Sequence, residues 1–116
     1  MEHPDAIDLA REHLLENRVL VAMVDGRVLG FATVLPRPDG DAELEALFVE
    51  PQAWRRGIGR ALVDACLAEA ARSGAKALHV IGNPNAQPFY DTCGFVTYGI
   101  GDMPFGKGIL MKKPIR

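Results

Sequence analysis

The chain of 116 residues is 48% hydrophobic and 24% charged, which predicts one globular domain over residues 1–116, too short for a second core. A net charge of −2 at pH 7 gives no reason to expect nucleic acid as a partner. No apolar run approaches the roughly 20 residues of a membrane span, and the first residues lack the apolar core of a signal peptide. We therefore expect a cytoplasmic protein with no membrane partner.

The first half of the sequence predicts one helix and three strands. Residues 5–16 carry apolar side chains at near-helical spacing, which predicts a helix. Two apolar runs at 18–24 and 27–35 predict strands, and the Asp25-Gly26 pair between them is typical of a tight hairpin. Residues 42–49 alternate well enough to form the next strand.

The second half predicts two helices and three strands. In chain order these are a helix at 58–73 ended by Gly74, a short buried strand at 77–81, a brief helix at 85–92, and two closing strands at 95–98 and 109–112 around the glycine-rich loop 99–108. Helices and strands in this order predict an α/β fold with a sheet of mixed direction.

The segment from Val49 to Leu62, VEPQAWRRGIGRAL, ends a strand in a turn of glycine and arginine and then opens a helix. The first amides of a helix have no internal partner, and the helix dipole adds partial positive charge there. Gly57 and Gly59 would let a ligand approach the main chain. The segment predicts an anionic, phosphate-bearing cofactor, although it lacks the Lys-Ser or Lys-Thr pair of a P-loop and the third glycine of a dinucleotide fingerprint.

Two motifs resemble the GNAT acetyltransferase family. Val49-Glu50-Pro51 followed by Trp54 to Gly59 is similar to its pyrophosphate loop, [QR]xxGx[GA] after a V-x-P strand end, with Trp54 in place of Gln or Arg. Residues 83–95, NPNAQPFYDTCGF, match NxxAxxFYxxxGF at every fixed position. Together the motifs span about 40% of the chain.

The resemblance implies a GNAT-like mixed central sheet with flanking helices and a cofactor held in a V-shaped opening between two parallel strands. It implies acetyl-CoA as co-substrate and direct transfer of the acetyl group to an amine, on a small molecule or a peptide. The family's usual first strand and helix have no counterpart here, and a homodimer would supply the missing wall of the acceptor groove. The alternative is a non-catalytic acyl-CoA-binding sensor or regulatory module.

The same resemblance suggests catalytic residues. Tyr90 occupies the tyrosine of the FY pair and would protonate the departing thiolate, or else only pack beside Phe89 and donate a hydrogen bond to the sulfur. Glu43 and Glu45 share one face of the strand that leads into the loop and are candidate bases, with Glu43 at the position of a base in some family members. The alternative is that both carboxylates are simply solvated.

Cofactor contacts are expected to be mainly from the backbone, with the strand end along the pantetheine arm and the loop around the pyrophosphate. The expected residues are Leu47, Phe48, Val49, Trp54, Arg55, Arg56, Gly57, Ile58, Gly59, Arg60, Asn83, Ala86, Phe89 and Tyr90. Asn85 is expected to cap the short helix. His79 is interpreted as packed or facing a helix and not as catalytic, and Tyr98 as part of the core. Cys66 and Cys93 are interpreted as buried thiols, with no metal site.

Overall fold

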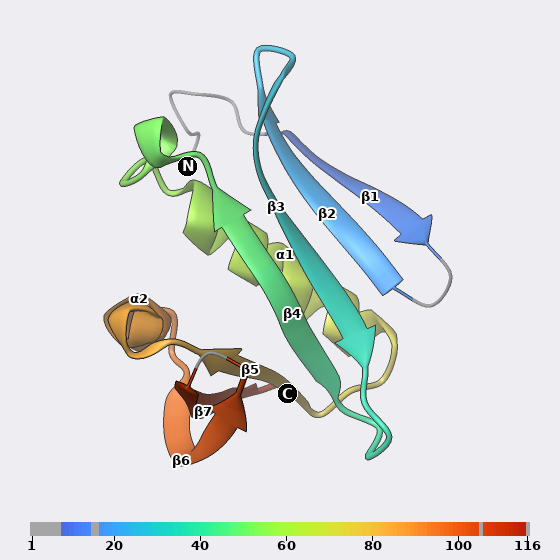
Figure 1. The fold of residues 1–116 in the computed structure, drawn as a ribbon. Helices are drawn as coiled ribbons and strands as arrows, with labels where there is room; N and C mark the ends of the chain where they lie inside the picture. The colour runs from blue at the N-terminus through green and yellow to red at the C-terminus, as the bar shows by residue number, and fades with distance from the viewer. Residues whose placement is uncertain (1–7, 15–16, 105, 116) are drawn as a thin grey trace.

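The computed structural model describes residues 8–14, 17–104 and 106–115, which form one mixed sheet of seven strands in the order β1-β2-β3-β4-β5-β7-β6 (Figure 1). This confirms the expected mixed sheet with flanking helices. The elements are β1 Asp8–Leu14, β2 Asn17–Val24, β3 Arg27–Pro36, β4 Ala42–Val49, the 3-10 turn η1 Pro51–Ala53, α1 Ile58–Arg72, β5 Ala77–Gly82, the 3-10 turn η2 Pro84–Ala86, α2 Gln87–Thr92, β6 Val96–Met103 and β7 Gly106–Pro114.

The helix predicted over 5–16 is wrong for the part of it that the structure describes. Residues 8–14 form β1, which pairs antiparallel with β2 from Asp8 opposite Met23 to Leu14 opposite Asn17. Over so short a segment, apolar residues at near-helical spacing also fit a strand, and the free edge of β2 offers a full set of backbone partners. The sheet therefore has an edge strand where we had expected a helix.

The hairpin predicted at Asp25-Gly26 is confirmed. Val24 pairs with Arg27, and the two turn residues take positive φ angles of 52° and 78°. A two-residue turn with both φ angles positive has the twist that antiparallel strands require, and Asp followed by Gly tolerates it. The turn therefore fixes the register of β2 against β3.

The centre of the sheet opens between β4 and β5, the only two neighbours of the described sheet that run parallel. They pair at three positions, the last of which joins Leu44 to Val80. Beyond that point β4 continues along β3 to Val49, while β5 continues along β7 to Gly82. Figure 1 shows the two strands diverging toward the end at which α1 begins. The V-shaped opening expected from the resemblance is therefore present.

Helix α1 covers one face of the sheet and supplies much of the core. Ile58, Leu62 and Cys66 lie on one face of the helix and are fully buried against β2 to β5. Burying a side chain such as Leu62 contributes roughly 2 kcal/mol. Both cysteines are buried free thiols, as predicted, and burial raises the pKa of Cys66 to about 12. Within the described residues no helix is both long and apolar enough to cross a bilayer.

The predicted glycine-rich loop 99–108 is mostly strand. β6 and β7 form a long hairpin in which Gly101 lies opposite Gly108. A Cβ at Gly101 would stand 3.0 Å from Leu110 Cδ2, so the missing side chain lets Leu110 lie across β6. Glycine here serves close packing in a strand, which a loop prediction from composition misses.

Candidate cofactor and active site

The turn between β4 and α1 presents unpaired backbone amides. Gly57 takes a left-handed conformation, with φ 81°, and begins α1 with no side chain capping the helix. The first intrahelical bond runs from the amide of Ala61 to the carbonyl of Gly57, so the amides of residues 58–60 are left for an external acceptor. Arg55 also has a positive φ, 67°, which is strained for a side chain of this kind. The turn therefore joins free donors, positive charge and backbone strain.

Trp54 stabilises this turn in a way the motif did not predict. Its indole Nε1 donates to the carbonyl oxygen of Val49 at 2.8 Å, so the side chain ties the turn to the end of β4. The ring itself is 61% exposed and lies on the wall of the adjacent cavity. Where Gln or Arg would offer the ligand a side-chain donor, Trp54 offers an aromatic surface.

The second motif lies directly against the first. Phe89 and Tyr90 are on α2, and Phe89 packs against the backbone of Gly59 at the start of α1. Asn83 Oδ1 accepts from the amides of Asn85 and Ala86, at 2.8 and 3.1 Å. The expectation that Asn85 caps the helix is therefore wrong, because Asn83, with extended backbone, is the residue whose side chain can reach the next two amides.

A cavity of about 590 Å³ lies between the two motifs, at the open end of the β4–β5 gap. A space of this size and mostly apolar lining is typical of a cofactor site. Ten of the predicted cofactor residues line it: Leu47, Phe48, Val49, Trp54, Arg55, Gly59, Asn83, Ala86, Phe89 and Tyr90. Pro51, Ala53 and Asn85 also line it and were missed, although Pro51 is the proline of the V-x-P strand end and the other two lie between motif positions.

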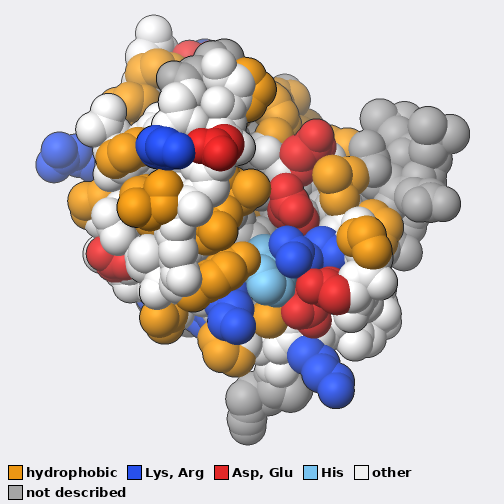
Figure 2. Space-filling model, turned by 60° about the horizontal axis from the view of Figure 1, so that its bottom comes forward, with side chains coloured by type: hydrophobic (Ala, Val, Ile, Leu, Met, Phe, Trp, Pro, Cys, Tyr) orange, Lys and Arg blue, Asp and Glu red, His pale blue; other side chains and the backbone are white. Residues whose placement is uncertain are grey.

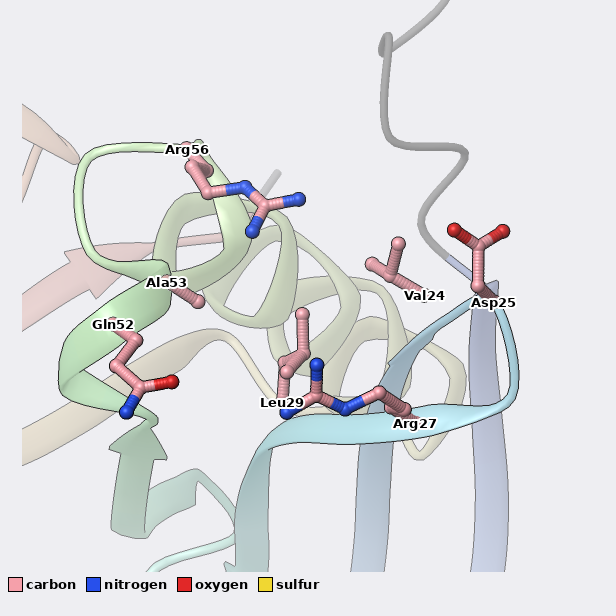
Figure 3. Close-up of a pocket in the computed structure, with 7 residues that line it drawn as sticks. All are labelled: Val24, Asp25, Arg27, Leu29, Gln52, Ala53 and Arg56. Atoms are coloured by element: carbon pink, nitrogen blue, oxygen red, sulfur yellow. The ribbon is translucent and has the colours of Figure 1, made fainter.

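Four predicted cofactor residues do not line this cavity. Ile58 has its side chain in the core, so only its amide could face a ligand, and Gly57 offers only backbone. Arg60 is exposed on α1. Arg56 instead lines a second cavity of about 150 Å³ together with Arg27 and Gln52, above the buried side chains of Val24, Leu29 and Ala53 (Figure 3).

Tyr90 is a buried residue that lines the large cavity. Its ring meets Phe89 and Phe95 edge to face, with centroids 5.1 and 5.4 Å apart, and lies beside Gly82, where a Cβ would be 3.4 Å away. Only 6% of the residue is exposed. Burial raises the pKa of Tyr90 to about 12, so the phenol stays protonated throughout the neutral range. The phenol is therefore available as a hydrogen-bond donor, and not as an anion, at neutral pH.

The two glutamates predicted as bases lie on β4, at the last paired positions and just beyond them. Glu43 is opposite His79 on β5, and its Oε1 lies 3.6 Å from Nη1 of Arg37. Glu45 is exposed and has no partner of its own on β3, where Thr33 pairs with Ala46 and Val34 with Leu44. Glu45 therefore marks a β-bulge next to the point where β4 and β5 separate. No local sequence pattern predicts this bulge, because a bulge depends on the register of the neighbouring strand.

His79 belongs to a hydrogen-bonded chain that sequence reasoning missed. The residue is 8% exposed, in agreement with the packed side chain expected from its position. Its Nε2 lies 3.0 Å from Asp41 Oδ2, and its Nδ1 lies 3.1 Å from the hydroxyl of Tyr98. Tyr98 is 47% exposed, so its assignment to the core is wrong: it stands on edge strand β6 and touches the body of the protein through its hydroxyl and ring edge.

Asp39, Asp41 and His79 bring possible metal-ligand atoms within 4.8 Å of one another. Each carboxylate is already bound by protein groups, Asp39 by the guanidinium of Arg37 and Asp41 by His79 and the amide of Lys76. The Arg37 hydrogen bond lowers the pKa of Asp39, and the His79 hydrogen bond lowers that of Asp41. The cluster is accounted for by these internal bonds.

Comparison with known proteins places these features in a family context. Residues 1–95 match the acetyltransferase (GNAT) family. A mycothiol acetyltransferase of Clavibacter michiganensis subsp. michiganensis is 53% identical over 55 residues, which are 47% of this chain and 17% of that protein. An uncharacterized N-acetyltransferase of Mycobacterium tuberculosis is 36% identical over 93 residues, covering 76% of this chain and 60% of that protein. The chain thus spans less than two thirds of the length of either curated relative.

Among solved structures, a GNAT family acetyltransferase from Elizabethkingia anophelis with acetyl-CoA bound superimposes with a TM-score of 0.85. The match covers 95% of this chain and 99% of that one at 14% identity. At this identity the likeness concerns the fold. It extends over nearly the whole of a similarly short chain.

Proposed function

Because this chain belongs to the GNAT acetyltransferase family, we propose that it is a cytoplasmic N-acetyltransferase that moves an acetyl group from acetyl-CoA to an amine. The observation that carries the proposal is the continuity of three features: the free amides at the start of α1, the 590 Å³ cavity, and the gap beside β4 that begins after Leu44. An elongated molecule with an anionic head and a thin arm fits this path.

In this proposal the pyrophosphate lies at the amides of residues 58–60 beside Arg55, where the helix dipole and the guanidinium both favour negative charge. The pantetheine arm then follows Leu47 to Val49 as an added strand would, using backbone groups of β4 that β5 leaves unpaired. The thioester reaches the point where the two strands separate.

The reaction needs a neutral amine. An alkyl amine with a pKa near 10.4 loses its proton at pH 7.4 at a cost of about 4 kcal/mol, so a base must assist. When nitrogen attacks the thioester carbon, negative charge grows on the carbonyl oxygen. A backbone N–H at the Glu45 bulge is our candidate donor to that oxygen, because the bulge interrupts the ladder at the strand opening.

We assign Tyr90 as the donor to the departing sulfur. Its position on the wall of the cavity and its protonated phenol support this role, either by proton transfer or by hydrogen bonding alone. Glu43 and Glu45 remain the candidate bases, and Glu43 is engaged by Arg37. A homodimer that covers the sheet face opposite α1 would complete the acceptor groove, and the molar mass in solution tests it.

The experiment is an assay of free thiol release from acetyl-CoA with a panel of alkyl and aryl amines. Turnover with any amine, reduced in Tyr90→Phe while acetyl-CoA binding is kept, supports the enzyme. Tight binding of acetyl-CoA without turnover by the wild type on the whole panel would favour the sensor alternative.

A further inference from the structure

Asp41, His79 and Tyr98 form a chain of three groups whose hydrogen-bond directions can be assigned. An ionised carboxylate can only accept, so the 3.0 Å contact requires His79 Nε2 to carry a proton toward Asp41 Oδ2. In a neutral imidazole Nδ1 is then an acceptor, and the Tyr98 hydroxyl donates to it at 3.1 Å. This hydrogen-bonded chain ends on one side at the charged carboxylate of Asp41. On the other side it ends at the phenol of Tyr98, which is half-exposed.

The chain stands at the base of the gap that the proposed thioester would occupy. His79 pairs with Glu43, one position before the last pair of β4 and β5. Its neighbours Leu78 and Val80 are buried in the core under α1, so alternation turns His79 to the opposite face of the sheet. Tyr98 reaches it from β6 across β7, and Figure 2 shows a histidine on this face among acidic and basic side chains.

The charges around His79 come from every neighbouring element. Asp41 flanks it from the turn before β4, and Glu43 flanks it from β4 itself. Lys112 is its partner on β7, and the Nζ of Lys112 lies 5.2 Å from the centre of the Tyr98 ring. Asp39 and Arg37, on the β3–β4 turn, pair with each other, and Arg37 also holds Glu43. Among these groups His79 is the one that both donates to a carboxylate and accepts from a phenol.

We propose that the Tyr98–His79–Asp41 chain takes the proton of the acceptor amine, an inference that rests on the acetyl transfer proposed above. The ammonium proton passes through water to the Tyr98 oxygen while the Tyr98 hydroxyl proton moves to His79 Nδ1. The free amine then forms the N–C bond, the C–S bond breaks, and the sulfur takes its proton from Tyr90. The nitrogen loses its second proton as the amide forms, and that proton returns to Tyr90 through solvent. The imidazolium gives its proton through Tyr98 to solvent, so the ammonium form of the amine releases one proton overall and no redox change occurs.

In this scheme Tyr98 acts on the substrate through water, and His79 and Asp41 are positioning residues. Asp41 holds His79 in the tautomer whose Nδ1 carries no proton and can accept one. The carboxylate also stabilises the imidazolium once it forms. The hydrogen bond from His79 lowers the pKa of Asp41, so the carboxylate is ionised when it is needed. Asp41 is itself fixed by the amide of Lys76, at 3.0 Å.

Amines of different basicity separate this role from a structural one. Wild type, Tyr98→Phe and His79→Gln would be assayed for thiol release with benzylamine, an ammonium ion at neutral pH, and aniline, a free base at neutral pH, within the same amine panel. We expect Tyr98→Phe to lower kcat/KM for benzylamine about tenfold or more and to change aniline by less than about twofold. With benzylamine the activity of Tyr98→Phe should keep rising with pH until the amine itself deprotonates, because the variant depends on the fraction of amine that is already neutral.

Asp64→Asn, an exposed carboxylate on α1, is the matched control and should behave like the wild type with both amines. Equal losses with both amines, or an unchanged pH profile in Tyr98→Phe and His79→Gln, would overturn the relay and leave the proposed function standing. Failure of the wild type to acetylate any amine of the panel would overturn the proposed function, and the relay with it. Thermal unfolding of Tyr98→Phe, which removes one hydroxyl, verifies that the fold is kept.

Discussion

Gly59 on α1 and Phe89 on α2 are in such close contact that a Cβ on Gly59 would stand 3.2 Å from Cζ and 3.4 Å from Cε1 of the Phe89 ring. One residue belongs to the loop motif and the other to the second motif. The contact joins the two into one wall of the large cavity, next to the first free amides of α1. A side chain at Gly59 would therefore act on both halves of the site.

Replacing Gly59 should weaken cofactor binding in proportion to the size and charge of the new side chain. In Gly59→Ala the ring of Phe89 must give way by a few tenths of an ångström, and we expect a loss of affinity for coenzyme A of several-fold. In Gly59→Glu a carboxylate would face the phosphates, and binding should be lost. Calorimetric titration measures both, and unchanged affinity in Gly59→Glu would contradict the loop assignment.

Arg55→Gly should change stability and affinity in opposite directions. Glycine adopts the φ of 67° without strain, so we expect the protein to gain up to about 1 kcal/mol. Loss of the guanidinium should weaken coenzyme A binding about tenfold and make it less dependent on salt. Lys107→Ala, on the β6–β7 hairpin away from the cavity, is the control and should keep wild-type affinity. A loss of stability would contradict the strain at Arg55, and unchanged affinity for coenzyme A would contradict its role in binding.

Tyr90→Phe should lower kcat while leaving acetyl-CoA affinity near that of the wild type. The ring contacts with Phe89 and Phe95 are kept, and only the hydroxyl that would meet the sulfur is lost. General acid catalysis of this kind contributes about a hundredfold, and hydrogen bonding alone about tenfold. Steady-state kinetics with a substrate amine give the ratio of the wild-type kcat to the kcat of the variant. A variant with full activity would remove Tyr90 from the mechanism.

The protein should lose stability in alkali because of Cys66. Its folded pKa, about 12, lies above the ordinary thiol value of 9.0, so the folded state keeps a proton that the unfolded state releases. Stability is therefore full below pH 9 and falls as pH rises from 9 toward 12, by an amount on the order of a few kcal/mol. Cys66→Ala should be less stable at neutral pH through the cavity it creates, yet show a shallower alkaline decline in urea unfolding. Equal slopes would contradict this account.

Local patterns were enough to predict the hairpin at Asp25, the helix from Ile58 and most of the residues that line the large cavity. In each case the information is carried by adjacent residues: a turn pair, an apolar stripe, or motif positions whose small or aromatic side chains line the cavity. Gly59 and Phe89 were both singled out in this way.

Apart from the local cap at Asn83, the main features that were missed depend on pairing between distant segments. Residues 8–14 became a strand because β2 offered an edge, and Glu45 became a bulge because of the register of β3. Tyr98 was assigned to the core because nothing local shows that β6 is an edge strand whose tyrosine reaches across β7 to His79. Such relations appear only when the whole sheet is assembled.

A crystal structure of this chain with acetyl-CoA tests the central claim most directly. We predict pyrophosphate oxygens within hydrogen-bond distance of the amides of residues 58–60, pantetheine along Leu47 to Val49, and the sulfur beside the hydroxyl of Tyr90. An empty gap between β4 and β5, or a cofactor bound elsewhere with these amides facing only water, would contradict it.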